Sequence, residues 1–200
     1  MTLRIVTIRS IIYFALMTVI TGIIYPLAVT AVAKVAFPYQ ANGSIIRIEG
    51  RKYGAENLGQ LYRSPAHLWG RQMNIDTSFT GTNGKPAAYA WPSNLSPAGE
   101  KLEGLIAERV KEIRAANPAM GERPVPVELV TSSGGGLDPH ISPAAALYQV
   151  PRIAAATGLT EERVTEIIKK HTEGRFLGIM GEPRVHVLKV NLELDGILKN

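Results

Sequence analysis

The feature that most constrains this chain is a run of 24 residues near its start, residues 10–33, that carries no charged side chain. A helix needs about 20 apolar residues to cross the hydrocarbon core of a bilayer. We therefore expect one membrane-spanning helix over residues 10–33. A signal peptide cleaved after Ala33 is one alternative, although its apolar segment is usually about 7–15 residues long. A buried helix of a soluble core is the other.

The basic residues beside this segment predict its orientation. Arg4 and Arg9 precede it without any acidic residue, whereas Lys34 follows it. Basic residues are enriched on the cytoplasmic side of membrane helices. We therefore expect residues 1–9 to form a short cytoplasmic N-terminus, and residues 34–200 to form one domain outside the cytoplasm.

Small side chains form a stripe along the predicted helix. Ala15, Thr18 and Gly22 are spaced i, i+3 and i+7, which places them on one face. Small residues let membrane helices approach each other closely. The stripe predicts contact with a partner helix, although such residues are also common in membrane helices that have no partner there.

Composition excludes several classes of site. The chain has no cysteine, so disulfides and cysteine-ligated metals are excluded. Its net charge is +5, but no run of Lys or Arg is longer than two residues. A nucleic-acid-binding surface needs clustered basic residues, so we expect no nucleic-acid partner.

Periodicity predicts an α+β domain with a small β-sheet and several helices. Residues 44–48, 58–62, 125–131 and 185–194 are the strand candidates, the last because apolar residues alternate along it. Helices are expected to begin after Ser96, Ser142 and Thr160, which are favourable N-cap residues. His186 is expected to be a core or capping histidine rather than a ligand.

Two stretches stand out as candidate contact surfaces. Residues 64–99 read as a long loop, and Trp69 and Trp91 within it either contact a partner or fix the loop to the core. The second stretch, residues 131–142, contains three consecutive glycines, Gly134, Gly135 and Gly136, followed by Asp138 and His140.

The 131–142 stretch matches no catalytic pattern. It has no Gly-Lys-Ser/Thr of a phosphate loop and no Gly-x-Ser-x-Gly of a serine hydrolase. Asp138 and His140 supply only two of the three or four ligands that a metal site needs. We expect a rigid turn in which Asp138 binds backbone amides and Ser142 caps a helix, with no catalytic residue and no metal.

The sequence resembles the family of C subunits of the bacterial Kdp potassium-transporting ATPase. The most specific matching stretch includes Leu137-Asp138-Pro139-His140-Ile141-Ser142-Pro143. The matching segments are residues 21–27, 37–44, 58–60, 69–71, 93–95, 114–118, 125–146, 148–152, 171–175 and 181–185.

The resemblance implies a non-catalytic subunit of a high-affinity, ATP-driven potassium importer in the bacterial inner membrane. It implies three partners: a channel-like potassium-translocating subunit, a P-type ATPase subunit and a small membrane peptide. It also implies a catalytic chaperone that raises the affinity of the pump for ATP, with Gln149 matching a residue linked to nucleotide. Potassium would be the transported ion, and no cofactor would be firmly bound.

A domain outside the cytoplasm cannot touch cytoplasmic ATP, so an effect on ATP affinity would be coupled through the membrane. We therefore expect the domain to dock on the external face of the channel-like subunit. Two other functions remain open. A membrane-anchored serine hydrolase would need Ser132, Ser133 or Ser142 near His140, and a secreted binding protein would need cleavage after Ala33.

Overall fold

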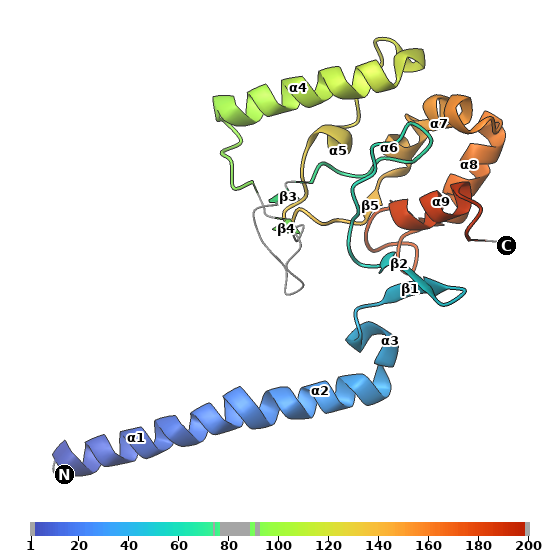
Figure 1. Cartoon of the computed structure of the whole chain (residues 1–200). Coiled ribbons are helices and arrows are strands. Elements are labelled where there is room, and N and C mark those ends of the chain that lie inside the picture. The colour runs from blue at the N-terminus through green and yellow to red at the C-terminus, as the bar shows by residue number, and fades with distance from the viewer. Residues whose placement is uncertain (1–2, 74, 77–88, 91–92, 199–200) are drawn as a thin grey trace. The chain divides into compact units, whose positions relative to one another are not determined.

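The computed structural model describes residues 3–73, 75–76, 89–90 and 93–198 (Figure 1). The chain divides into two compact units, Met1–Ile45 and Ile46–Asn200. Trp91 lies outside the described residues, so its predicted partner contact stays a prediction.

The first unit is built on one long helix. α1 (Leu3–Val19), the π-helical segment η1 (Ile20–Ile24) and α2 (Tyr25–Ala36) follow one another without a break. Among the described residues, the stretch Leu3–Ala36 is the one helix long and apolar enough to cross a membrane, and none of it is buried. This exposure is inconsistent with a buried helix of a soluble core.

The π-helical segment ends two residues before Pro26. The Tyr25 N–H donates to the Ile20 carbonyl, five residues earlier. Proline has no N–H to continue an α-helical ladder, and a single wide turn accommodates such a position within an otherwise regular helix. The helix ends at Ala36, and the short α3 (Pro38–Ala41) and a turn at Gly43 lead out of it.

Three small sheets in the described part of the chain confirm the α+β class. β1 (Ile45–Ile48) pairs with β2 (Arg51–Ala55), and β3 (Ile75–Asp76) pairs antiparallel with β4 (Tyr89–Ala90). The third sheet has the order β5-β7-β6, with β5 (His140–Ile141) and β6 (Thr172–Glu173) both antiparallel to β7 (Arg184–His186).

The helices of the domain begin largely where cap residues predict. Ser142 accepts a hydrogen bond from the Ala145 amide at the start of α6 (Pro143–Leu147), and Thr160 accepts one from Arg163 at α8 (Glu161–Lys170). Between them α7 (Val150–Thr157) ends at Gly158, whose φ of 73° suits a residue without a Cβ. These predicted caps are confirmed.

The helix predicted to begin after Ser96 starts later. α4 spans Glu100–Ala116, because the Ser96 carbonyl closes a separate turn with the Gly99 amide at 3.0 Å. α4 ends before Asn117-Pro118, as predicted, and the short 3₁₀ helix η2 (Pro118–Met120) follows. Figure 1 shows α4 lying along one side of the domain next to α5 (Val127–Val130).

Three strand predictions are wrong. Residues 127–130 of the predicted 125–131 strand form α5, residues 58–62 form no strand, and β2 lies at 51–55 instead. Of residues 185–194 only the first two are in a strand; the rest form α9 (Val187–Leu194), which His186 caps. The apolar residues of α9 also recur every four positions, and its buried Asn191 fits a helix packed on two sides.

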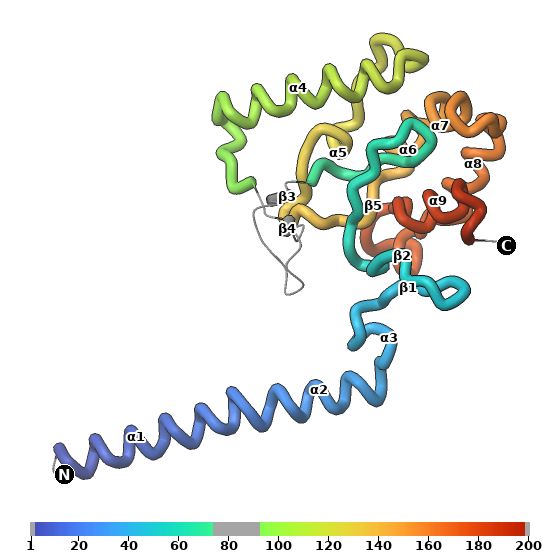
Figure 2. Tube along the Cα trace, in the orientation of Figure 1, coloured from blue at the N-terminus to red at the C-terminus, as the bar shows by residue number. Residues whose placement is uncertain are grey.

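The core lies where α6, α7, α8 and α9 meet the segment around residue 68. Its fully buried apolar side chains include Leu68, Ile113, Leu129, Ile141, Ile153, Val164, Ile168, Val185 and Val190. In Figure 2 the green trace of this segment passes close to α6. Hydrogen bonds join Leu68 to Asn191 of α9 and Trp69 to Gln149, which follows α6. Leu68 and Trp69 are not paired with a strand, and side chains instead form hydrogen bonds with their backbone groups.

Candidate functional site

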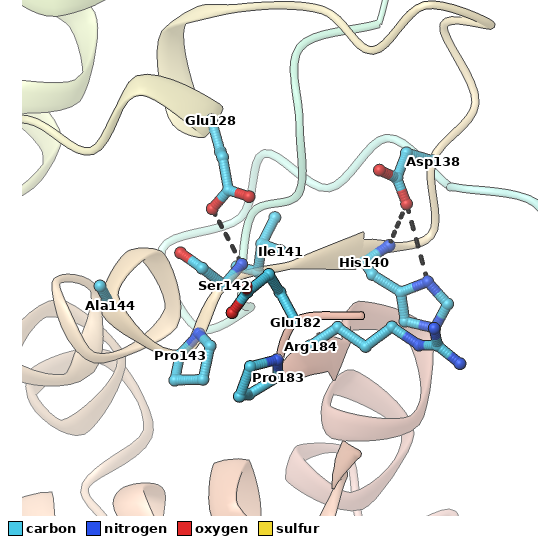
Figure 3. Close-up of a pocket in the computed structure, with 10 residues that line it drawn as sticks. All are labelled: Glu128, Asp138, His140, Ile141, Ser142, Pro143, Ala144, Glu182, Pro183 and Arg184. Carbon is cyan, nitrogen blue, oxygen red and sulfur yellow. Dashed lines mark hydrogen bonds and ion pairs between the residues drawn. The ribbon is translucent and has the colours of Figure 1, made fainter. Parts of the chain in front are cut away.

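A recess of about 600 Å³ opens on the surface of the domain beside β5 and β7 (Figure 3). Three separate parts of the chain line it: Glu128 of α5, residues 138 and 140–144, and residues 182–184. Asp138 and His140, both predicted from the sequence as contact residues, line this recess. Glu182 and Arg184 line it as well, and they were not predicted.

Asp138 fixes the local backbone of the recess. One of its carboxylate oxygens, Oδ1, accepts a hydrogen bond from the His140 backbone amide at 2.9 Å and lies 3.6 Å from His140 Nδ1. The other oxygen lies 3.9 Å from Nη1 of Arg71. The predicted backbone-binding role of Asp138 is therefore confirmed.

His140 forms a histidine pair with the residue opposite it in the sheet. Its ring meets His186 edge-on, with the ring centroids 5.1 Å apart. Burial lowers the pKa of His140, and the positive charge of Arg184 lowers it further. Burial also lowers the pKa of His186 to about 4, so both rings are neutral near pH 7.

Two serines of this region, Ser133 and Ser142, accept hydrogen bonds from backbone amides. Ser142 Oγ accepts from the Ala145 amide at 3.2 Å, and Ser133 Oγ accepts from the Asp138 amide at 3.3 Å. In Figure 3 the His140 ring lies on the side of Asp138 and Arg184, away from Ser142. The described residues include no group of three or more His, Asp or Glu side chains that could hold a metal ion.

The three glycines form an open turn beside the recess. A Cβ atom at Gly134 or Gly135 would meet nothing within 4 Å, and Gly136 has a φ of 73°. The turn therefore has free space around it. Its predicted contact with a partner stays a prediction.

Gln149 lies in the core rather than in the recess. The side chain is 1% exposed. Its Oε1 accepts hydrogen bonds from the Trp69 amide at 2.9 Å and from Arg152 Nη2 at 2.6 Å, and its Nε2 donates to the carbonyls of Trp69 and Ala145 at 3.0 and 3.1 Å. A primary amide offers two donors and two acceptor positions, so all four are occupied inside the chain.

Asn191 forms the same kind of hydrogen-bond pair with Leu68, the residue before Trp69. Its Oδ1 accepts from the Leu68 amide at 2.7 Å, and its Nδ2 donates to the Leu68 carbonyl at 2.9 Å. Gln149 and Asn191 thus satisfy both backbone groups of two consecutive residues, as a neighbouring β-strand would. Buried backbone groups without such partners are costly.

Arg152 completes this buried network. Its guanidinium donates to Asn117 Oδ1 at 3.1 Å, to Gln149, and to the backbone carbonyls of residues 64, 65 and 67. It also lies 4.5 Å from the centre of the Trp69 ring. Burial lowers its pKa to about 10, which leaves the group protonated at neutral pH. We call Gln149, Arg152 and Asn191 the buried polar network.

Trp69 is part of the region that this network holds. The side chain is 7% exposed, and its indole N–H donates to the Ser64 carbonyl at 2.8 Å. The tryptophan therefore has little surface to offer a partner in the chain as described. Its location fits the alternative role considered for it, which is to fix the loop to the core.

The stripe on the N-terminal helix has a different environment. No residue of α1, η1 or α2 is buried, so Ala15, Thr18 and Gly22 all remain exposed. The Thr18 hydroxyl donates to the Phe14 carbonyl at 2.8 Å, within its own helix. Gly22 lies in the π-helical segment, and a Cβ there would meet nothing within 4 Å.

The family model described as "KdpC: K+-transporting ATPase, c chain" matches residues 7–196. The chain belongs to the KdpC family. A potassium-transporting ATPase KdpC subunit of Clostridium perfringens is 56% identical over 96% of this chain and 97% of its own length. KdpC subunits of Sorangium cellulosum and Methylococcus capsulatus are 48% and 46% identical, over 94% and 90% of this chain and 95% and 92% of theirs. The resemblance found in the sequence is confirmed.

One exposed feature of this KdpC-family domain, close along the chain to the recess residue Glu182, was not predicted from the sequence. Phe176, Leu177, Ile179 and Met180 are 53% to 77% exposed. The signal available in the sequence is a cluster of large apolar residues between Gly174 and Gly181, too short for a core element and without a polar alternation.

Proposed function

We propose that this chain is the non-catalytic subunit of an ATP-driven potassium import complex. The family match over residues 7–196 carries the proposal. The apolar helix Leu3–Ala36 supports a membrane location, because a helix of this length and hydropathy is left unburied by the described part of the chain.

The N-terminus lies in the cytoplasm of this proposed arrangement, and the domain lies outside. Arg4 and Arg9 before the helix support this orientation. The uncleaved helix anchors the chain in the bacterial inner membrane. The stripe of Ala15, Thr18 and Gly22 faces a helix of another subunit there.

The domain docks on the external face of the channel-like subunit and stabilises its assembly with the P-type ATPase subunit and the small membrane peptide. The recess and the Gly134–Gly136 turn supply the contact surface. Both are open in the isolated chain, and Asp138 and Ser142 hold their backbone rigid. Potassium is the ion that the complex transports, and this subunit binds no cofactor of its own.

A catalytic-chaperone effect on ATP affinity is indirect in this arrangement. Such coupling between distant sites typically amounts to about 1–3 kcal/mol. Direct nucleotide contact by Gln149 would require breaking hydrogen bonds at all four positions of its amide. We infer that Gln149 influences the pump by keeping residues 64–69 in place.

The test is potassium uptake by cells in which this subunit ends after residue 45, so that the membrane helix remains and the domain is missing. High-affinity uptake is expected to disappear. Uptake that persists with the helix alone would contradict the proposed role of the domain. The mass of the N-terminal peptide of the full chain separates an anchored subunit from a secreted protein cleaved after Ala33.

A further inference from the structure

Four large apolar side chains gather at the end of one tight turn of the domain. Phe176, Leu177, Ile179 and Met180 are each more than half exposed, within five consecutive residues. We call residues 176–180 the apolar tip. Single exposed apolar residues are common on proteins, whereas a contiguous exposed group marks a contact surface.

The apolar tip has a fixed shape before any partner binds. The Phe176 amide donates to the Met180 carbonyl at 2.8 Å, and the Met180 amide donates back to the Phe176 carbonyl at 3.0 Å. At the base of the turn, Arg175 Nη2 donates to both carboxylate oxygens of Glu182, at 2.9 and 2.8 Å. A preformed contact element loses less conformational entropy on binding.

Leu177 is unexpected at its position in the turn. Its φ is 53° and that of Gly178 is 76°, so both central residues have positive φ. Asn, Asp and Gly are preferred at such positions, because a side chain like leucine is crowded there. A polar residue would suit both the backbone and the surrounding water better, so local folding does not account for this leucine.

The base of the apolar tip is joined to the recess by an ion pair. Glu182 pairs with Arg175 below the tip and also lines the recess, as does Arg184, which binds Glu173 at 2.7 Å. Glu182 therefore links the base of the tip to the lining of the recess.

The charges around this surface favour a protein partner over a bilayer. Glu173, Glu182 and Asp138 each lie within 4.0 Å of an arginine side chain, and Glu128 binds the Ser142 amide. Peripheral lipid-binding surfaces combine exposed apolar side chains with a surplus of Lys and Arg that attracts anionic headgroups. Paired charges provide no such surplus, but they are compatible with the polar rim of a protein interface.

The area of the tip fits the centre of such an interface. Its four side chains expose roughly 500 Å², if each would expose about 150–200 Å² when fully accessible. A stable interface buries about 800 Å² on each partner. The tip alone is too small, and the adjoining recess and its rim supply the remaining area.

We propose that the apolar tip inserts into an apolar pocket on another protein subunit of the membrane ATPase, with the recess receiving polar side chains around that pocket. This inference rests on the proposed function, because it assumes the complex. The tip then provides a second attachment beside the membrane helix, and two linked contacts bind far more tightly than either alone.

Photo-cross-linking in cells tests the proposal on the full chain. A photo-reactive amino acid replaces Leu177, and the chain is expressed with the other ATPase subunits. The matched control carries the same group at Leu159, which is 36% exposed on the connection between α7 and α8. Position 177 is expected to cross-link to an ATPase subunit at least about tenfold more than position 159, in line with a contact at the centre of an interface.

The outcomes separate the two proposals. If the chain co-purifies with the ATPase but position 177 cross-links only to lipid, or to nothing, the apolar tip is not the contact and the proposed function stands. If the chain does not co-purify with the ATPase at all, the proposed function fails and the inference fails with it.

A substitution that suits the turn provides a second readout. Leu177→Asn keeps a residue that tolerates positive φ, so the domain is expected to unfold at the same denaturant concentration. Recovery of the ATPase subunits with the tagged chain is expected to fall about tenfold, whereas Leu159→Asn leaves it unchanged. Equal recovery with both variants would overturn the proposal.

Discussion

The buried polar network and the apolar tip both depart from the usual arrangement of an apolar core and a polar surface. The network places polar side chains in the core, where Gln149 uses all four of its hydrogen-bonding positions and Asn191 binds both backbone groups of Leu68. The tip places apolar side chains in water, and no described part of the chain covers them. The first arrangement determines the shape of the domain. The second is completed only by another molecule.

Burial and hydrogen bonding distinguish structural residues from contact residues here, whereas residue type does not. Gln149 and Trp69 have the chemistry of binding residues, yet both are buried and bonded. Leu177 has the chemistry of a core residue, yet it stands at an exposed turn. Substitutions in the network should therefore affect stability, and substitutions in the tip should affect assembly.

Arg152→Ala is expected to have the largest effect. It leaves Asn117, Gln149 and several backbone carbonyls without their donor in a buried region. The free energy of unfolding should fall by about 3–5 kcal/mol. Urea denaturation of the full chain in detergent, followed by tryptophan fluorescence, measures this.

Arg114→Ala is the matched control for that substitution. Arg114 is exposed and pairs with Glu122, which is almost fully exposed. Surface pairs contribute about 0–1 kcal/mol, so the variant should differ little from the unsubstituted chain. Equal effects of the two substitutions would show that the buried network does not hold the domain together.

Gln149→Glu is expected to cost about 2–3 kcal/mol. The carboxylate can still accept from Trp69 and Arg152, but it cannot donate to the carbonyls of Trp69 and Ala145. Any change in the KM for ATP is expected only together with this loss of stability, because Gln149 acts by holding Trp69 and its neighbours in place. A changed KM with unchanged stability would instead indicate direct contact between Gln149 and nucleotide.

Acidification is expected to destabilise the domain through His186. Burial holds its pKa at about 4, with Lys189 and His140 adding to the effect, below the ordinary value of about 6.5. The unfolded chain therefore binds a proton first, so the stability from neutral His186 is complete above pH 6.5 and is lost as the pH falls toward 4.

The size of this loss can be isolated with His186→Asn. Asparagine is also a favourable N-cap for α9 but does not titrate. Between pH 7.5 and 4.5 the unsubstituted chain should lose about 2 kcal/mol more than the variant. Identical pH profiles would mean that His186 is not held neutral by its surroundings.

Leu177→Asn should have the smallest effect on stability, within about 0.5 kcal/mol, as is usual for exposed positions. A large loss of stability would show that the tip is part of the fold rather than a contact surface. Unfolding measured beside the Arg152 variants gives the comparison directly.

The sequence predicted those parts of the fold that depend on neighbouring residues. Ser142, Thr160 and Gly158 mark helix ends correctly, because a cap acts within about three residues. α9 was not predicted, since its apolar residues fit a strand as well as a helix. Packing on both sides and the contact of Asn191 with Leu68, 123 residues away, favour the helix.

The candidate site could be predicted only where its residues are neighbours in the sequence. Asp138 and His140 were found because they are close together in the sequence. Their meeting with Glu182 and Arg184 depends on the pairing of β5 with β7. The buried polar network joins residues 80 or more positions apart, which spacing alone cannot reveal. The tip was missed because exposure is a property of the folded domain.

The most direct measurement is the side of the membrane on which the recess and the apolar tip lie. The chain has no cysteine, so Gly135→Cys introduces a unique thiol. Gly135 is preferable to Gly136 because a side chain there meets nothing within 4 Å and its φ is not positive. A membrane-impermeant thiol reagent is expected to label this residue in intact cells, which would make any effect on ATP affinity indirect. Labelling only after lysis would place the domain in the cytoplasm and contradict docking on the external face.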